Sequence, residues 1–275
     1  MNRLILSSHT ASRDTFRHLV EATAAAEVRA IALTYREYRR FAAGGESDAD
    51  MVAATREHGV QVVDVEAVYA VLEPDPDGRT AAYANRLFAL AELFGAESIG
   101  VHSDVEGDLD TAAERLARFC DRAADHGLVV GVEPVAVMGL RDLATAWAIM
   151  ERAERPNAGL VLDTWHFSRG AGTLEMIRSL PGRAFRTVQI SDGRIEPPPG
   201  LDYLEDTLTN RMLPGEGDFD LVGIISALQQ VGAEVGWDME ICSSSLDRLP
   251  GKEAARRAAE ATRSVLVRAG QSPGG

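Results

Sequence analysis

Polar side chains close each of the last four apolar runs of the sequence. They are Glu133, Asp163, Gln189 and Glu240. If these runs are neighbouring parallel strands, their ends converge, and three carboxylates brought to one point repel one another unless a cation neutralises them. The pattern therefore predicts a metal ion where the runs end. The alternative for each side chain is an isolated group that caps the following helix or pairs with an arginine.

The elements that position these side chains follow from the spacing of apolar residues. Short runs that are apolar on both faces alternate along the chain with longer segments of helical periodicity. The expected strands are residues 3–7, 30–34, 60–65, 98–102, 128–133, 159–163, 186–191 and 237–241. The expected helices are residues 13–26, 48–58, 80–94, 109–126, 140–152, 173–180, 219–231 and 252–267. Strict alternation implies parallel strands joined by right-handed crossovers, and hence an α/β fold.

Eight strand–helix pairs over the whole length favour a closed (βα)8 barrel, the TIM barrel, formed by residues 1–270 as a single domain. A doubly wound open sheet is the alternative. Such a sheet usually carries a glycine-rich phosphate turn after its first strand, and residues 8–12, SHTAS, contain no glycine. In a barrel the active site lies at the carboxyl ends of the strands, which is where the four polar side chains stand.

One long loop is expected at residues 193–217, after the seventh strand. It carries PPPG at 197–200 and LPGEG at 213–217, and a loop of this length in a compact barrel is typical of a lid or a binding loop. Ser47 and Asp218 are expected to cap the starts of helices, and Gly59 to end one. The last five residues, 271–275, are expected to form a disordered tail.

The charge balance narrows the class of partner. The chain of 275 residues carries 42 acidic and 28 basic side chains, a net charge of −14. This acidity argues against nucleic acid as a partner, because binding the phosphate backbone requires a basic face. The first apolar run is too short for a signal peptide, and no run reaches the length of a membrane span, so no membrane partner is expected. With only Cys120 and Cys242, neither a disulfide framework nor a thiolate zinc site is expected, and the cytoplasm is the expected location.

Five short motifs, taken in order, resemble those of a known family. The motifs are GVEP at 131–134, LDTWH at 162–166, VQISD at 188–192, PGEG at 214–217 and ME at 239–240. In this order and spacing they resemble the xylose isomerase-like barrels, the superfamily of sugar phosphate isomerases and epimerases. The resemblance runs from about residue 95 to 245 and implies the same (βα)8 fold.

The resemblance implies one divalent metal ion, Mn, Mg or Co, held by four ligands. In this chain the ligands are Glu133, Asp163, Gln189 and Glu240, with glutamine where most members have histidine. An amide oxygen still coordinates a hard cation, and an all-oxygen site shifts the preference from Zn towards Mn or Mg. Glutamine at this position, with Arg211 shortly before the Pro-Gly motif, resembles the 3-dehydroshikimate dehydratase branch.

The resemblance also implies the catalytic groups. Glu133 and Glu240 would act as acid and base from opposite faces of the substrate, as in the epimerases of the family. His166 would face the substrate and transfer a proton. The alternative for His166 is a loop-packing histidine.

Four further residues are candidates for contacts with the substrate. His102 and Glu66 stand at or near the ends of expected strands. Trp165 can form a wall of the pocket, and Arg211 offers a fork for a carboxylate or phosphate. The alternatives are a satisfied polar group, a buried aromatic and an exposed loop arginine. Cys242 is expected to pack rather than to react.

The expected reaction begins with removal of a proton next to a carbonyl, through a metal-stabilised enediolate. Returning the proton gives the leading hypothesis, a metal-dependent isomerase or epimerase of a small sugar, sugar phosphate or cyclitol. Expelling a hydroxyl gives the alternative, a dehydratase of the 3-dehydroshikimate or inosose kind. An AP-endonuclease-like nuclease is disfavoured by the acidic charge, and a non-catalytic sugar-binding barrel by the intact ligand set. The oligomeric state stays open, homo-oligomers included.

Overall fold

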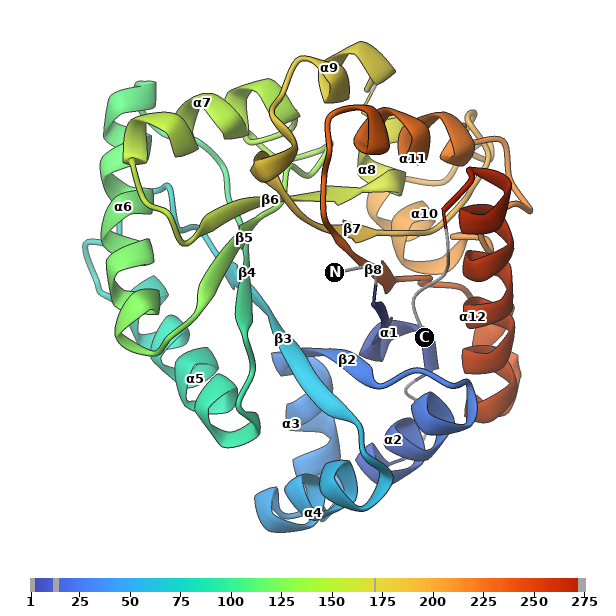
Figure 1. The fold of residues 1–275 in the computed structure, drawn as a ribbon. Coiled ribbons are helices and arrows are strands. Elements are labelled where there is room, and N and C mark those ends of the chain that lie inside the picture. Colours follow the sequence, from blue (N-terminus) through green and yellow to red (C-terminus); the bar gives the residue numbers. More distant parts are fainter. Residues whose placement is uncertain (1–2, 12–14, 171, 272–275) are drawn as a thin grey trace.

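The structure, a computed structural model, describes residues 3–11, 15–170 and 172–271. Eight parallel strands form a closed barrel in which each strand pairs with the next, and β8 pairs with β1 (Figure 1). The strands are β1 (Leu4–Ser7), β2 (Ala30–Thr34), β3 (Gln61–Tyr69), β4 (Ser98–His102), β5 (Val129–Val132), β6 (Ala158–Asp163), β7 (Phe185–Gln189) and β8 (Gly236–Met239). The predicted (βα)8 barrel is confirmed.

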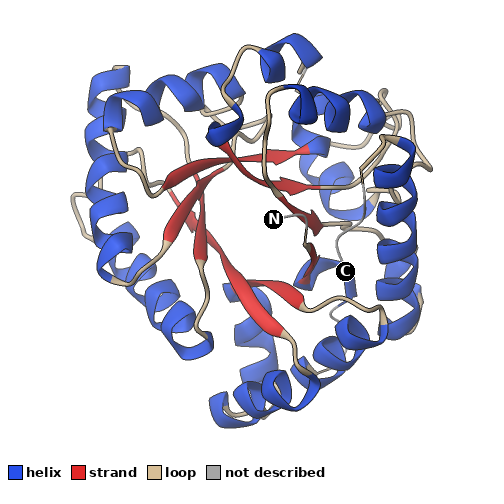
Figure 2. Ribbon diagram, viewed as in Figure 1, coloured by secondary structure: helices blue, strands red, loops and turns tan. Residues whose placement is uncertain are grey.

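Helices form a ring around the strands (Figure 2). Those that match the eight expected helices are α2 (Phe16–Ala25), α4 (Asp48–His58), α5 (Arg79–Phe94), α6 (Leu109–Asp125), α7 (Leu143–Ala153), α9 (Leu174–Arg178), α11 (Leu221–Gln230) and α12 (Gly251–Arg268). Apolar side chains such as Leu6, Phe88 and Trp237 are buried in the main core. The strands read as nearly continuous apolar runs because the helices cover the outside of the parallel sheet.

Side-chain caps decide where several helices begin and end. Ser47 accepts a hydrogen bond from the backbone N–H of Asp50, whose carboxylate accepts one from the backbone N–H of Ser47, and this reciprocal box starts α4. Gly59 ends the same helix in the left-handed conformation, at φ 61°. The predicted cap at Asp218 is wrong, because the backbone N–H of that residue is still bonded to the preceding loop. Asp220 caps α11 instead.

Four further helices lie on the carboxyl-terminal side of strands. They are α1 (Ser8–Ala11), α3 (Tyr35–Ala43), α8 (Thr164–Arg169) and α10 (Tyr203–Thr209). The helices α1, α3 and α8 each begin at the residue after a strand ends. The helix α10 interrupts residues 193–217, so the prediction of one continuous loop is wrong there. The helix α10 begins after Asp202, because the side chain of Asp202 accepts a hydrogen bond from the backbone N–H of Glu205 and so caps the helix.

The predicted strand-end residues stand at slightly different depths. Asp163 and Gln189 are the last residues of β6 and β7, whereas β5 and β8 end just before Glu133 and Glu240. The backbone N–H of Glu133 still bonds to β4, at 3.1 Å. That of Glu240 bonds to the carbonyl two residues before it, at 3.0 Å, which turns the chain at this point.

Two predictions concern the surroundings and the ends of the barrel. Among the described residues, no helix is long and apolar enough to cross a membrane. Of the expected tail, only Gln271 is described, and residues 272–275 lie outside the described residues, so the predicted disorder is not tested.

Candidate active site

Glu133, Asp163 and His166 form one cluster at the carboxyl end of the barrel. One ligating atom from each of the three side chains lies within 4.8 Å of the other two. The Nε2 atom of His166 is 3.7 Å from Glu133 Oε1 and 3.8 Å from Asp163 Oδ2. All three residues are buried. The topology produces this cluster because β5 and β6 are neighbours and α8 begins where β6 ends.

The two oxygens of Asp163 have different partners. Oδ1 accepts hydrogen bonds from the backbone N–H groups of Trp165, at 2.6 Å, and His166, at 3.3 Å, and so caps α8. Oδ2 accepts one from the guanidinium of Arg211 at 2.8 Å. The role of a helix cap, the alternative considered for Asp163, therefore accounts only for Oδ1, and Oδ2 faces the cluster.

Arg211 bridges two of the predicted metal ligands. Its Nη1 atom donates to Asp163 Oδ2 and lies 3.2 Å from Glu240 Oε2. The residue is only 3% exposed, and its guanidinium carbon lies 5.7 Å from the centre of the Trp165 ring. Arg211 is therefore no exposed loop arginine, because the chain after α10 turns its side chain into the barrel mouth.

Trp165 lies in the packed layer beneath the site. Its side chain is 0% exposed, and the ring packs edge-on against Phe219. The guanidinium groups of Arg169 and Arg211 lie over the ring. The prediction that Trp165 forms a wall of the substrate pocket is therefore corrected: the start of α8 directs the ring into the protein, where it supports Arg211.

Gln189 offers an amide oxygen to the site. Its Nε2 group donates to Oε1 of Glu66 at 3.0 Å. This hydrogen bond fixes the orientation of the amide, with the nitrogen towards Glu66. The Oε1 atom of Gln189 is buried and has no hydrogen-bond partner among the described residues. An unsatisfied buried acceptor costs about 1–3 kcal/mol. A cation or a water molecule at this atom would remove that cost.

Glu66 belongs to a group of acids inside the barrel. Burial, and then the charges of Asp64 and Asp238, raise the pKa of Glu66 well above its ordinary value. Both side-chain oxygens of Asp238 are buried and have no hydrogen-bond partner in the described part of the chain. Glu66 therefore stands as a hydrogen-bonding support of Gln189, with its side chain held inside the barrel.

The oxygen donors fit a hard divalent cation. They are the carboxylates of Glu133, Asp163 and Glu240 and the unpartnered amide oxygen of Gln189, carried at the ends of four consecutive strands. Such oxygen ligands are the ones that Mg and Mn bind in proteins. Arg211 places one positive charge beside the same acids.

Burial and charge shift the pKa values of the two acids that Arg211 contacts in opposite directions. Burial raises the pKa of Asp163, and the Arg211 charge opposes this only in part. Burial also acts upward on Glu240, but Arg211 and His9 outweigh it and hold the pKa of Glu240 well below its usual range. Glu240 is therefore the more firmly ionised of the two acids.

His102 is paired with Glu133. The Nε2 atom of the ring is 2.5 Å from Oε2 of the carboxylate. Burial pulls the pKa of His102 down, but the charge and hydrogen bond of Glu133 outweigh it and raise the pKa above its ordinary value. The ring packs edge-on against Tyr69, which is 51% exposed. His102 thus connects the buried acid to the open rim of the barrel.

Tyr203, the first residue of α10, holds His166. Its hydroxyl is 2.8 Å from Nδ1 of the His166 ring, and the two rings stack with their centroids 5.9 Å apart. Burial, and then the charge of Asp163, raise the pKa of Tyr203 to about 12. The phenol therefore stays protonated at neutral pH.

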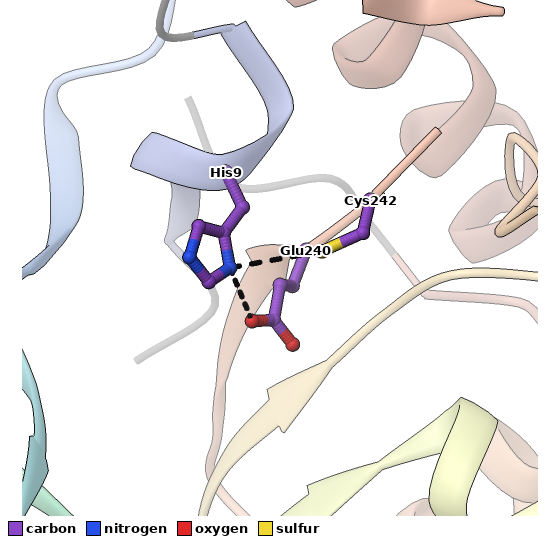
Figure 3. Close-up of side chains that lie close together, drawn as sticks. All are labelled: His9, Glu240 and Cys242. Atoms are coloured by element: carbon purple, nitrogen blue, oxygen red, sulfur yellow. Dashed lines mark hydrogen bonds and ion pairs between the residues drawn. The ribbon is translucent and has the colours of Figure 1, made fainter. Parts of the chain in front are cut away.

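A second cluster adjoins Glu240 at the carboxylate oxygen that does not contact Arg211 (Figure 3). It consists of Glu240, His9 from α1 and Cys242, which follows β8. The Nδ1 atom of His9 lies 3.1 Å from Glu240 Oε1 and 3.6 Å from Cys242 Sγ. Cys242 is buried, as its expected packing role requires.

Sequence reasoning missed His9 and Tyr203. His9 stands two residues past the end of β1, which is the same strand-end position that identified the other candidates. That signal was present in the sequence. Tyr203 lies within residues 193–217, where no periodicity indicates the direction of a side chain, so nothing in the sequence distinguished it.

Comparisons with known proteins agree with the fold. The profile of the family described as xylose isomerase-like TIM barrel matches residues 20–265. A 3-dehydroshikimate dehydratase of Pseudomonas aeruginosa is 29% identical over 194 residues, which cover 69% of this chain and 30% of that protein. An inosose isomerase of Bacillus velezensis is 27% identical over 158 residues, which cover 57% of this chain and 55% of that protein. The chain thus spans about a third to about half of the length of these relatives.

A solved structure has the same architecture over nearly the whole length. The IOLI protein with a binding zinc atom superimposes with a TM-score of 0.86 at 18% identity, covering 97% of this chain and 98% of that chain. A likeness at this identity concerns the fold alone. The family profile, in contrast, matches well over half of the sequence. The chain belongs to the xylose isomerase-like TIM barrel family.

Proposed function

We propose that the protein is a metal-dependent enzyme that removes a proton next to the carbonyl of a small cyclic polyhydroxylated ketone. The observation that carries the proposal is the group of oxygen donors at the barrel mouth, with the amide oxygen of Gln189 buried and unpartnered among the described residues. The substrate class is supported by the named substrates of the two relatives, since 3-dehydroshikimate and inosose are both cyclic polyhydroxylated ketones.

Four side chains would hold one divalent ion, Mn, Mg or Co. They are Glu133, Asp163, Gln189 and Glu240. When bound, the ion polarises the carbonyl and stabilises the negative charge that develops on its oxygen as the proton leaves. The chain itself contributes the buried acids and the charge of Arg211, which contacts both Asp163 and Glu240.

His166 is the proposed proton carrier on the substrate side. A protonated phenol at Tyr203 can donate its hydrogen to Nδ1, and the proton of the neutral ring then resides on Nε2. This nitrogen faces Glu133 and Asp163. His166 would therefore donate a proton from Nε2, while Glu133, paired with His102, accepts one.

Of the two reactions, we favour loss of water. The favouring observation is Gln189, because glutamine at this ligand position resembles the 3-dehydroshikimate dehydratase branch, and a relative of that name is similar to this chain. Elimination also requires an acid for the departing hydroxyl, and the contact between Tyr203 and His166 supports a histidine poised to donate. The leaving oxygen would take the Nε2 proton and depart as water.

Isomerisation or epimerisation is the second candidate. Its supporting observation is the pair of glutamates, Glu133 and Glu240, at the mouth of the same barrel, together with the similarity to inosose isomerase. Two carboxylates can share the work, one removing a proton and the other returning it.

An assay in D2O separates the candidates. The protein is incubated with 3-dehydroshikimate, inososes and ketoses in the presence of Mn, Mg or Co, and the products are followed by NMR. Water loss with an unsaturated product supports the dehydratase, whereas deuterium exchange without water loss supports the isomerase or epimerase. Absence of exchange and of turnover with every compound and every metal would contradict the proposal.

A further inference from the structure

The cluster of His9, Glu240 and Cys242 presents three different ligating atoms to one point (Figure 3). One ring nitrogen of His9, one carboxylate oxygen of Glu240 and the sulfur of Cys242 all lie within 4.8 Å of one another. The residues come from the two ends of the chain, and the pairing of β1 with β8 brings them together. None of the steps proposed above uses His9 or Cys242.

The two distances from His9 to its neighbours in this cluster are close to those between ligands of a tetrahedral zinc ion. Metal–ligand bonds of about 2.0–2.3 Å place neighbouring ligand atoms roughly 3.3–3.7 Å apart. The Nδ1 atom of His9 lies 3.1 Å from Glu240 Oε1 and 3.6 Å from Cys242 Sγ. For these two pairs of atoms, shifts of a few tenths of an ångström would reach the spacing of zinc ligands.

Hydrogen bonds alone satisfy this arrangement poorly. Both contacts converge on the same nitrogen of His9. This nitrogen carries at most one hydrogen, so when it donates to the carboxylate of Glu240 it cannot also accept from the thiol of Cys242. A metal ion bound to all three atoms satisfies them together.

The cluster is also open on one side. A cavity of about 430 Å³ is lined by His9, Cys242 and neighbouring residues such as Ser8 and Ser243. The side chain of His9 is 24% exposed, whereas that of Glu240 is 10% exposed. An ion can enter through this cavity, and a water molecule can complete the coordination, as in zinc sites with three protein ligands.

We propose that His9, Glu240 and Cys242 form a second metal site, which binds Zn²⁺ through nitrogen, oxygen and sulfur, with water as the fourth ligand. Cys242 binds as the thiolate and His9 through an unprotonated Nδ1, and the protons that the two side chains lose are released to solvent. The proposal departs from the expectation from the sequence that no thiolate zinc site is present. A site with one cysteine, formed by residues from opposite ends of the chain, has no recognisable spacing.

Glu240 connects this second site to the proposed catalytic one. Its Oε2 atom faces Arg211 at 3.2 Å, while its Oε1 atom faces His9. A zinc ion at the second site would draw on the same carboxylate that the catalytic ion requires. Zinc in excess is therefore expected to inhibit an enzyme loaded with Mn or Mg, and this consequence rests on the proposed function.

Cobalt is the probe for the second site itself, because cobalt bound to a thiolate has a charge-transfer band in the near ultraviolet. Metal-free protein titrated with Co²⁺ should develop this band. Cys242→Ser should abolish it and weaken Zn²⁺ binding by roughly 100-fold, and His9→Asn should weaken Zn²⁺ binding similarly. Cys120→Ala is the matched control and should keep the band, because burial raises the pKa of Cys120 to about 12 and keeps it a thiol.

Glu133→Gln separates this site from the catalytic one. This variant loses a proposed ligand of the catalytic ion only, so the band should persist even if the proposed function fails. Circular dichroism verifies that each variant is folded. If Cys242→Ser does not fold, the Zn²⁺ affinity of His9→Asn still tests the site. A wild-type protein without the band, or Zn²⁺ affinities in Cys242→Ser and His9→Asn equal to that of the wild type, would overturn the proposal.

Discussion

The carboxylate of Asp163 accepts a hydrogen bond from Arg211 at 2.8 Å, at a place where both side chains are almost fully buried. The same guanidinium nitrogen lies 3.2 Å from Glu240. Removing one partner from a buried ion pair leaves an uncompensated charge, which is far more costly than losing a pair at the surface. Arg211 therefore supplies part of the positive charge that these acids need, and a divalent ion would supply the rest.

Removal of the Arg211 guanidinium should destabilise the metal-free protein more than the metal-bound protein. Arg211→Met is expected to lower the free energy of unfolding by about 3–5 kcal/mol in the presence of a chelator. Saturating Mn²⁺ should recover part of this loss, because the ion neutralises the same carboxylates. Urea unfolding with chelator and with Mn²⁺ measures both effects.

Arg194→Met is the matched control for that experiment. Arg194 forms an exposed ion pair with Asp218 at 3.2 Å, and such a pair contributes at most about 1 kcal/mol. If Arg211→Met is no more destabilising than Arg194→Met, the buried pair does not have the role inferred for it.

Asp163 should be required for binding of the catalytic ion, and this role is separate from its capping of α8. Asp163→Asn keeps an acceptor for the N-terminus of α8, whereas Asp163→Ala removes it and should cost about 1 kcal/mol of helix stability in addition. Asp163→Ala is expected to abolish binding of Mn²⁺, as is Glu133→Ala, whereas Asp163→Asn should weaken it, because the amide keeps an oxygen but loses the charge. Elemental analysis after dialysis against Mn²⁺ measures the occupancy. Asp121→Asn, at an exposed pair with Arg155, should retain the ion of the wild type.

As a ligand, Gln189 should set the metal preference of the proposed site. Gln189→His should retain a metal but favour Zn²⁺ over Mn²⁺ by at least about tenfold, because imidazole nitrogen suits zinc better than an amide oxygen does. Calorimetric affinities for the two ions in both proteins give the ratio, and Cys242→Ser in both backgrounds removes the second zinc site. An unchanged ratio would mean that Gln189 is not a ligand.

The fold could be predicted, and a candidate site proposed, because both depend on local patterns. Apolar runs alternate with helical segments along the chain, and polar residues stand where the runs end. That rule located Glu133, Asp163, Gln189 and Glu240 without any knowledge of contacts. The helix α10 was missed because its start depends on a single capping residue, Asp202, after a proline-rich stretch.

The contacts of the candidate site could not be predicted in the same way. Residues 9 and 240 are 231 positions apart, and only closure of the barrel by β1 and β8 brings His9 to Glu240. The inward direction of Arg211 likewise depends on how the chain returns from α10. The buried position of Trp165 follows from where α8 begins. This helix has only six residues, too few for the spacing of apolar residues to predict where it begins or which side chains face inward.

The last prediction tests how Tyr203 holds His166. The two rings stack, and the hydroxyl of Tyr203 lies 2.8 Å from Nδ1, so Tyr203→Phe keeps the stacking and removes only the hydrogen bond. Without it the proton of the neutral ring no longer favours Nε2. We expect kcat to fall about 10- to 100-fold, with metal occupancy unchanged.

Two variants define the range of that experiment. His166→Ala should reduce turnover further, by about 100- to 10,000-fold, because it removes the proton carrier itself. Tyr38→Phe, which removes a hydroxyl bonded to Asp48 at the start of α4, should leave kcat unchanged. Rates are compared at neutral pH, where the pKa of about 12 keeps Tyr203 protonated in the wild type, so the hydrogen bond is intact in the reference protein. If Tyr203→Phe turns over like Tyr38→Phe, the hydroxyl does not position His166.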